Sequence, residues 1–211
     1  MALKIGKSII ELPAPKSNKS DTVFNVLKKR ETVREISDKK IPLQIISNLL
    51  WAANGVNREK GPFRIAGRTA ASASNSQEID IFAVMEEGIF LYDAFKNCLI
   101  QVAAGDLRHL SINVGQSEMI TGTPLNLIYV ADVDKLVHTS GFQEPGLHDP
   151  EVQKSYYFVD TGLIAGNVYL YAASIGLASW FHNCNRKELE QKLKLRSDQH
   201  VLFGQTIGYP A

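Results

Sequence analysis

A long apolar helix signal constrains this chain more than any other feature. The helical pattern runs from about Pro150 to Leu177, and its second half, GLIAGNVYLYAASIGL, is apolar on nearly every side. Such a helix has to be buried, yet its apolar run of about 16 residues falls short of the ~20 that cross a bilayer. Gly162 and Gly166 stand four residues apart, which lets another backbone approach closely. The sequence therefore predicts tight helix packing, within the chain or across a subunit interface.

The composition indicates a folded and nearly neutral protein. Its 211 residues include 23 Lys and Arg against 22 Asp and Glu, which gives a formal net charge of +1. So balanced a charge favours neither nucleic acid nor an anionic membrane as a partner. Hydrophobic residues make up 45% and charged residues 21%, which argues against a disordered chain. We predict a single domain over residues 1–211, in which residues 1–20 form an extended N-terminal arm.

The residue types that bind metals or form disulfides are sparse. Cys98 and Cys184 are too few and too far apart for a disulfide framework or a paired-cysteine zinc site, so we interpret them as free buried thiols. The five histidines show no metal-ligand spacing, and we expect no metal site. The N-terminal residues MALKIGKSIIELPAPK lack the pattern of a signal peptide, which predicts a cytoplasmic location.

Periodicity and turn signals divide the rest of the chain into short elements. Two stretches lack periodicity: residues 61–77, which we interpret as a loop that holds a ligand, and residues 135–149, which we interpret as a lid or a binding loop. The predicted elements are a helix that starts at Ser20 or Asp21, a helix from Pro42 to a stop at Gly55, a hairpin of EIDIFAVM and IFLYD, a helical segment around Phe95 to Gly115, a strand from Pro124 to Asp132, a helix RKELEQKLKL after the N-cap Asn185, and a strand VLFGQTIGYP.

A basic cluster, Arg30, Thr32 and Arg34, follows the first predicted helix. In an extended segment, alternate residues point to one side, so the two guanidinium groups would bracket the hydroxyl. Arginine offers planar paired donors that stay ionised, and this set could bind a phosphate. The alternative interpretation is a solvated charged turn in which Glu31 and Glu35 are the partners of the arginines.

A polar cluster, Ser72, Asn75 and Gln77, lies in the stretch AASASNSQ. Small residues let the backbone come close to a flat ligand, and an amide side chain offers both a donor and an acceptor to a heterocycle. The alternative is a polar surface loop. The chain contains no G-x-G-x-x-G motif between a strand and a helix, no P-loop and no G-x-S-x-G elbow, so three common enzyme classes lack motif support.

Taken in order, four segments resemble the nitroreductase family of flavoproteins, over nearly the whole chain. KRETVRE is similar to the family pattern R-x-S-x-R, and RTAASASNSQ is similar to R-T-A-P-S-A-G-N-x-Q. DTGLIAGNVYLYAASIGLAS looks like the long central helix of the family, and TIGYP resembles its last core strand. Within the family, the chain looks most like the branch related to the oxidoreductases of thiazole- and oxazole-forming peptide pathways.

The resemblance implies a fold and a cofactor. The fold would be an α+β, nitroreductase-like α/β sandwich, with a mixed central sheet flanked by helices. Two chains would form an intertwined homodimer that holds one FMN at each of two interface sites. The glycine-containing helix would then form the core of the dimer.

The resemblance also implies roles for individual residues. Arg30, Thr32 and Arg34 would hold the phosphate, the ribityl chain and the N1/O2 side of the FMN ring. Ser72, Asn75 and Gln77 would line the isoalloxazine from the partner subunit. A loop after the long helix, Trp180 to Cys184, would present backbone N–H groups near flavin N5 and O4, which makes His182 and Asn183 further candidates.

The expected activity is a two-electron, ping-pong transfer. Hydride would pass from NADH or NADPH to FMN, and a small organic acceptor, such as a nitroaromatic, a quinone or an enone, would then be reduced. No catalytic side chain is required. Phe142, Tyr156 and Tyr157 would either pack on the acceptor or fill the core. The alternatives are a flavin-binding protein without NAD(P)H turnover and a cofactor-free dimer of the same fold.

Overall fold

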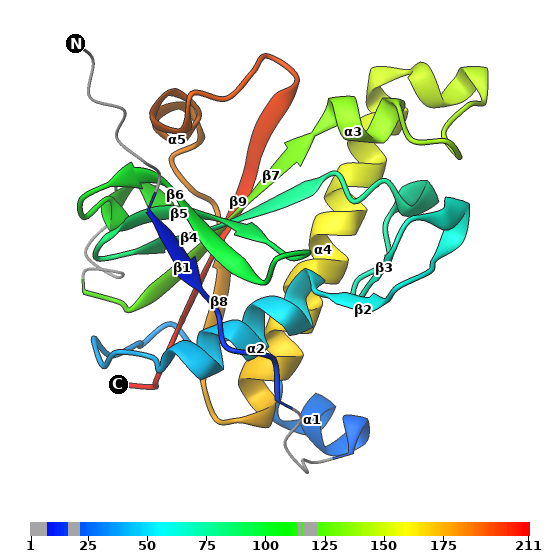
Figure 1. The fold of residues 1–211 in the computed structure, drawn as a ribbon. Coiled ribbons are helices and arrows are strands. Elements are labelled where there is room, and N and C mark those ends of the chain that lie inside the picture. Colours follow the sequence, from blue (N-terminus) through cyan, green and yellow to red (C-terminus); the bar gives the residue numbers. More distant parts are fainter. Residues whose placement is uncertain (1–7, 17–21, 114, 116–121) are drawn as a thin grey trace.

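A seven-stranded sheet forms the centre of the protein in its computed structural model, which describes residues 8–16, 22–113, 115 and 122–211. The strand order is β1-β6-β5-β4-β7-β9-β8 (Figure 1). Every neighbouring pair among these strands is antiparallel, so the expectation of a mixed sheet is wrong for this chain. The strands are β1 (Ile9–Glu11), β4 (Ile79–Met85), β5 (Gly88–Asp93), β6 (Cys98–Ala104), β7 (Leu125–Asp132), β8 (Ala178–His182) and β9 (Gln199–Gly208).

Helices cover both faces of the sheet, as the α+β class predicts (Figure 1). Side chains of β4 alternate between the two faces: Ile81 and Ala83 pack with the helices α2 and α4, whereas Phe82 and Val84 pack with α5. The helices are α1 (Val23–Lys29), α2 (Leu43–Asn54), α3 (Val133–Val137), α4 (Pro150–Ser174) and α5 (Arg186–Leu193). A separate two-stranded ribbon is made of β2 (Val56–Arg58) and β3 (Gly67–Arg68).

Several of the predicted elements are confirmed. Helix α2 begins after Pro42 and ends before Gly55, and the predicted hairpin is β4 and β5. The strands β7 and β9 and the helix α5 also form where they were predicted. The predicted starts of α1, Ser20 and Asp21, lie outside the described residues, and the N-cap of this helix is Thr22, whose hydroxyl accepts a hydrogen bond from the backbone of Asn25.

One prediction near the edge of the sheet needs correction, and another is made more specific. The helical segment expected around residues 95–115 is mainly the strand β6, followed by a short 3₁₀ turn, Arg108–Ser111. Its strand state is set by pairing with β5 on one side and β1 on the other. The described part of the predicted N-terminal arm is extended, and Ile9–Glu11 adds the edge strand β1 to the sheet.

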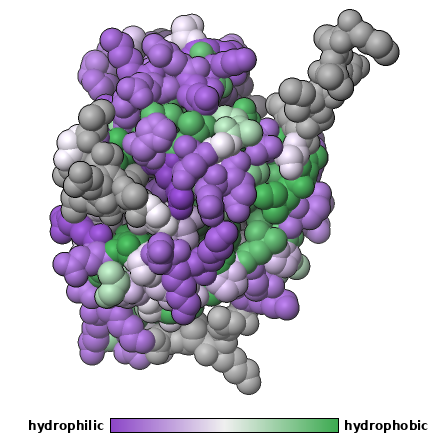
Figure 2. Space-filling model, turned by 90° about the vertical axis from the view of Figure 1, so that its left-hand side faces the viewer, coloured by the Kyte–Doolittle hydropathy of each residue, from purple (hydrophilic) through white to green (hydrophobic). Residues whose placement is uncertain are grey.

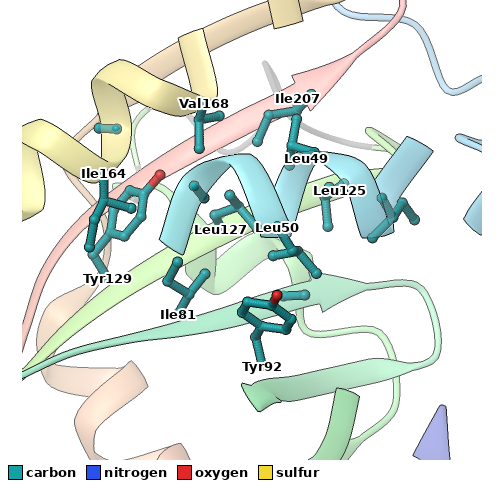
Figure 3. Close-up of a cluster of buried hydrophobic side chains, with 14 of the residues drawn as sticks. Leu49, Leu50, Ile81, Tyr92, Leu125, Leu127, Tyr129, Ile164, Val168 and Ile207 are labelled. Carbon is teal, nitrogen blue, oxygen red and sulfur yellow. The ribbon is translucent and has the colours of Figure 1, made fainter. Parts of the chain in front are cut away.

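The main core lies between the sheet and the helices α2 and α4. Figure 3 shows Leu49 and Leu50 of α2 and Ile164 and Val168 of α4 pointing toward the strands. Tyr129 of β7 is fully buried in the same cluster. This packing fixes the direction of α4 across the sheet.

Replacing Leu50 with alanine is expected to lower the free energy of unfolding by about 2–5 kcal/mol, because the truncation removes buried contacts and leaves a cavity. Leu43 begins the same helix but is 39% exposed, so Leu43→Ala should cost less than about 1 kcal/mol. Urea denaturation of both variants measures the difference. Equal losses would contradict the observed packing of α2.

One face of α4 is exposed in the single chain, so the expectation that this helix is buried all round is wrong for one copy. Val159 is 60% exposed and Leu163 is 45% exposed. A Cβ added at Gly162 or Gly166 would meet no atom within 4 Å. We call these four residues together with Leu170 the α4 stripe; their spacing places them on one side of the helix.

Exposed apolar side chains also occur outside α4, most densely on the small helix α1. On the face shown in Figure 2, hydrophilic residues dominate and smaller hydrophobic patches lie between them. The small helix α1 departs from this rule, because Val23 is 71%, Phe24 66% and Leu27 55% exposed. Exposed apolar side chains gathered on one element are a common mark of an interaction surface.

Candidate functional site

The segment after α1 brings Arg30 and Thr32 to the C-terminal half of α4. The hydroxyl of Thr32 lies 3.2 Å from the phenol oxygen of Tyr169, and the guanidinium of Arg30 lies 5.7 Å from the centre of the same ring. The phenol oxygen of Tyr169 also accepts a hydrogen bond from the backbone N–H of Phe181 in β8. Tyr169 therefore joins the basic cluster to α4 and to the edge strand of the sheet.

Arg34 extends the same cluster along β8. The backbone N–H of Val33 donates to the carbonyl of Ser179, which keeps this segment extended beside the strand. The guanidinium of Arg34 lies 5.6 Å from the centre of the Trp180 ring, and that ring lies 4.7 Å from the imidazole of His182. Arg30 and Thr32 thus lie at Tyr169, and Arg34 lies further along the same segment at Trp180.

The two guanidinium groups are exposed and carry unbalanced charge. Within the described part of the chain, neither Arg30 nor Arg34 forms an ion pair, and Glu31 and Glu35 do not serve as their partners. The alternative interpretation, a charged turn in which Glu31 and Glu35 neutralise the arginines, therefore lacks the ion pairs that it requires. Two unpaired cations beside a hydroxyl are a chemically suitable arrangement for a phosphate.

His182 and Asn183 are adjacent in sequence, but the first side chain is buried and the second is exposed. The expected loop from Trp180 to Cys184 is strand β8 through His182. His182 is buried: its Nδ1 lies 2.9 Å from the carbonyl oxygen of Asn183, and its Nε2 lies 2.8 Å from the hydroxyl of Thr206. Burial lowers the pKa of His182, which favours a neutral imidazole. The side chain of Asn183 is exposed, so only Asn183 faces solvent beside the cluster.

The second predicted cluster forms a compact loop, residues 72–77, which contains a 3₁₀ turn at Ala73–Asn75. The amide of Gln77 donates to the carbonyl of Ala66 at 2.7 Å and accepts from Arg68 at 2.6 Å. The hydroxyl of Ser72 accepts from the backbone N–H of Gln77, and the amide of Asn75 donates to the carbonyl of Pro62. Much of the hydrogen-bonding capacity of the two amides is used within the protein, where it shapes the loop.

The 72–77 loop is held in an uncommon backbone conformation. Ser74, Asn75 and Gln77 all have positive φ, between 50° and 56°. Residues other than glycine adopt this region at a cost of about 1 kcal/mol or more each, so the surroundings have to enforce it. Gly141 packs closely on this loop, since a Cβ added at Gly141 would lie 2.7 Å from the Cβ of Ser74.

A single chain does not bring the two clusters together. The basic cluster contacts α4 at Tyr169, whereas the 72–77 loop contacts it at Asp160, whose carboxylate accepts from the N–H of Ala73 at 2.8 Å. Nine helical residues separate these points, or about 14 Å along the axis. A ligand that needs both clusters in contact would therefore have to use clusters from two chains or bridge a considerable distance.

Three residues of the site were not found from the sequence. Tyr169 lies inside the apolar run and gives no polar signal. Glu78 and Asp160 are buried carboxyl groups beneath the 72–77 loop. Asp160 stands just before the apolar half of α4, and a carboxyl group at that place in the pattern was the only available hint.

The predicted binding segment 135–149 contains α3 and a 3₁₀ turn at Pro145–His148. Phe142 is 1% exposed and packs edge-on against Tyr156, with ring centres 5.5 Å apart. Tyr156 and Tyr157 are half-buried. Phe142 therefore has the core role, while both tyrosines retain some exposed surface.

The described residues form neither a membrane-spanning helix nor a cluster of metal ligands. None of the helices among them has the length and hydrophobicity to span a bilayer. In the same part of the chain, no three His, Cys, Asp or Glu side chains are grouped so that they could hold a metal ion. Cys98 and Cys184 are free and buried, as predicted.

The fold and the site define an α+β protein in which a basic, hydroxyl-containing cluster and a strained polar loop contact one long helix at two separate points. The sequence model of the nitroreductase family matches residues 27–209. The chain therefore belongs to the nitroreductase family, and it is a nitroreductase-family oxidoreductase.

Individual relatives agree with this assignment. A protein of Ralstonia eutropha JMP134 described as a nitroreductase is 30% identical, and its crystal structure matches with a TM-score of 0.79 over 96% of this chain and 90% of that chain. A protein of Methanocaldococcus jannaschii assigned as a nitroreductase is 27% identical over 162 residues, which are 74% of this chain and 75% of the relative. The NADPH:FMN oxidoreductase of Vibrio harveyi, crystallised with NAD+, is similar in fold: it is 17% identical, with a TM-score of 0.61 over 89% of this chain and 68% of that chain.

Proposed function

We propose that this protein is an FMN-dependent oxidoreductase that transfers two electrons between NADH or NADPH and a small organic acceptor of the nitroaromatic, quinone or enone type. The observation that carries the proposal is the placement of Arg30 and Thr32 at Tyr169 and of Arg34 at Trp180 along one short segment, with both guanidinium groups unpaired among the described residues. This set fits the phosphate and the electron-rich edge of a flavin.

The chain's own residues would bind and orient the cofactor. Arg30 and Thr32 would hold the phosphate and the ribityl chain, and Arg34 would lie at the N1/O2 side, where a cation stabilises negative charge. Bound FMN would supply the hydride chemistry. Among the 72–77 residues, Ser72 retains a hydroxyl hydrogen for a ligand, whereas Asn75 and Gln77 would act mainly by shaping the loop against the ring. Asn183 would contribute from the end of β8, with the buried His182 behind it.

We infer that the working form is a homodimer in which each site uses clusters from both subunits. The separation of the two clusters along α4 supports this, as does the exposed α4 stripe. A groove of about 320 Å³ lies between α1, α2 and α4, and its lining includes Val23, Val26, Trp51 and Leu170. An apolar helix of a second copy would fill such a groove. On this proposal, residues 1–211 act as one domain.

The branch of the family is a finer proposal. It rests on the general resemblance of the chain to the branch of the thiazole- and oxazole-forming pathways. In that case a peptide azoline would lose two electrons and two protons to FMN, and a separate oxidant such as dioxygen would have to re-oxidise the reduced cofactor.

Absorbance of the purified protein tests the function. After incubation with FMN and removal of the free cofactor by gel filtration, we expect the protein fraction to keep a flavin band near 450 nm, and we expect NADH or NADPH to bleach it under nitrogen. A bound band that NAD(P)H leaves unchanged would favour a flavin-binding protein without turnover. No band, with no rise of melting temperature on adding FMN, would favour a cofactor-free dimer and would refute the proposal.

A further inference from the structure

Two buried carboxyl groups lie beneath the 72–77 loop. Glu78, the first residue after the loop, is 0% exposed, and Asp160 of α4 is 4% exposed. The negative charge of Asp160 adds to the effect of burial in raising the pKa of Glu78, so the two carboxyl groups are electrostatic neighbours. Two ionised carboxylates in such a position would repel each other at short range without solvent to screen them, so one of the two has to carry a proton.

Each carboxyl group holds a different part of the loop. Asp160 accepts the N–H of Ala73 at 2.8 Å, and Glu78 accepts the hydroxyl of Ser76 at 2.6 Å. Between these two anchors lie Ser74 and Asn75, two of the residues with positive φ. A strained segment persists only while its surroundings hold it in place. The two hydrogen bonds, at Ala73 and at Ser76, hold this segment at both of its ends.

The second oxygen of Glu78 indicates where the proton resides. Oε1 of Glu78 is buried and has no hydrogen-bond acceptor or donor assigned to it within the described part of the chain. Such an oxygen is costly as part of a carboxylate and is satisfied as the O–H of a neutral acid that donates to Asp160. Asp160 then keeps the negative charge that its contact with the Ala73 N–H favours.

We propose that Glu78 and Asp160 share one proton and act as positioning residues that lock the 72–77 loop in the form that receives the cofactor. This inference rests on the proposed function, because it assigns the loop to flavin binding. Neither carboxyl group touches the candidate cofactor surface itself. Loss of the shared proton would leave two carboxylates that repel each other, and this repulsion would displace one or both anchors and let the strained loop relax.

The charges around the pair agree with a shared proton. Burial, followed by the charge of Asp160, raises the pKa of Glu78 to about 8, and burial also raises the pKa of Asp160. From β7, the backbone N–H of Asp132 donates to the carbonyl of Glu78. From β3, the guanidinium of Arg68 is bonded to Gln77 and to the carbonyl of Asn54. On β4, the next carboxyl group, Asp80, is paired with Lys135 at 2.6 Å.

The test is the pH dependence of FMN affinity, measured by quenching of FMN fluorescence from pH 6.5 to 9. In the wild type, the Kd should be flat up to pH about 8 and then rise by up to about tenfold per pH unit. Glu78→Ala should raise the Kd about tenfold at pH 7, because Ser76 and Asp160 both lose a partner. Glu78→Gln keeps a donor to Asp160 and an acceptor for Ser76, so it should restore the affinity to within about threefold and remove the pH dependence. Parallel curves for Glu78→Gln and wild type would overturn the proposal.

The matched control is Glu87→Gln, which makes the same change at an exposed carboxyl group in the β4–β5 turn and should keep the wild-type curve. If Glu78→Gln does not fold, as judged by circular dichroism, Asp160→Asn replaces it. Its amide can accept from Ala73 and donate to Glu78, so it should also remove the rise in Kd above pH 8.

A cofactor-free measurement separates this inference from the proposed function. Because the pKa of Glu78 is raised in the folded state, its stabilising contribution is complete below the unfolded value near 4.5 and is lost as the pH rises toward about 8. The Tm of the wild type should therefore fall relative to that of Glu78→Gln between pH 5 and 8. Absence of FMN binding at every pH would refute the proposed function, whereas equal Tm profiles would refute the shared proton.

Discussion

Replacing Gly162 with arginine is expected to convert the protein to monomers and to abolish FMN binding. Gly162 lies in the α4 stripe, where a Cβ would meet no atom within 4 Å in the single chain. The larger side chain therefore fits the monomer. Replacing glycine also stabilises the helix, by up to about 0.8–1.0 kcal/mol. Within a close helix–helix contact, the same side chain would clash and bury an unpaired charge.

Sedimentation velocity and FMN titration measure the two effects of Gly162→Arg. We expect the dimer to weaken by at least about 1000-fold, which corresponds to roughly 4 kcal/mol, while the Tm of the monomer stays equal or rises. Gln191→Arg is the matched control, because it adds the same charge to an exposed position of α5 on the opposite face of the sheet. An intact dimer of Gly162→Arg would contradict the proposed interface.

Replacing Arg34 with alanine is expected to weaken FMN binding by about 10- to 150-fold. A hydrogen bond to a charged group contributes about 1.5–3 kcal/mol, and Arg34 has no competing ion pair among the described residues. Arg34→Lys should recover only part of the affinity, because an ammonium group lacks the paired donors of the guanidinium. Isothermal titration with FMN measures these differences.

Riboflavin, which lacks the phosphate, distinguishes the roles of the two arginines. Arg34→Ala should weaken riboflavin and FMN alike if Arg34 lies at the ring, whereas Arg30→Ala should weaken FMN alone if Arg30 binds the phosphate. Arg58→Ala, at an exposed arginine of β2, is the control and should leave both affinities unchanged. An unchanged FMN affinity in Arg34→Ala would refute its role.

Local signals predicted the elements whose structure is set locally. A proline before α2, a glycine after it and the alternation in β4 each act over a few residues, and each of these elements forms as predicted. The strand β6 was missed because its sequence, CLIQVAA, has no clean alternation, and its state depends on pairing with β1 and β5. The exposed face of α4 was missed for a similar reason, since an apolar run does not reveal which partner covers it.

The candidate site likewise contains residues that could be predicted from the sequence and residues that become apparent only in the fold. Arg30, Thr32 and Arg34 could be selected from the sequence because their chemistry and spacing are visible there. Their shared partner, Tyr169, lies far along the chain in an apolar run and becomes apparent only in the fold. Likewise, Glu78 and Asp160 look like two ordinary acidic residues until β4 and α4 are packed together.

The pairing of β7 with β9 has a consequence for how the protein folds. Leu125 of β7 lies opposite Ile207 of β9. The chain between these two paired strands is long and contains α4, β8 and α5. Local hairpins such as β4–β5 can form early, whereas closing so long a loop is entropically slow. Trp180 reaches its place only when β8 joins β9. We therefore expect the Trp180 surface to be among the last parts of the molecule to form, so that cofactor binding would select chains that have finished folding.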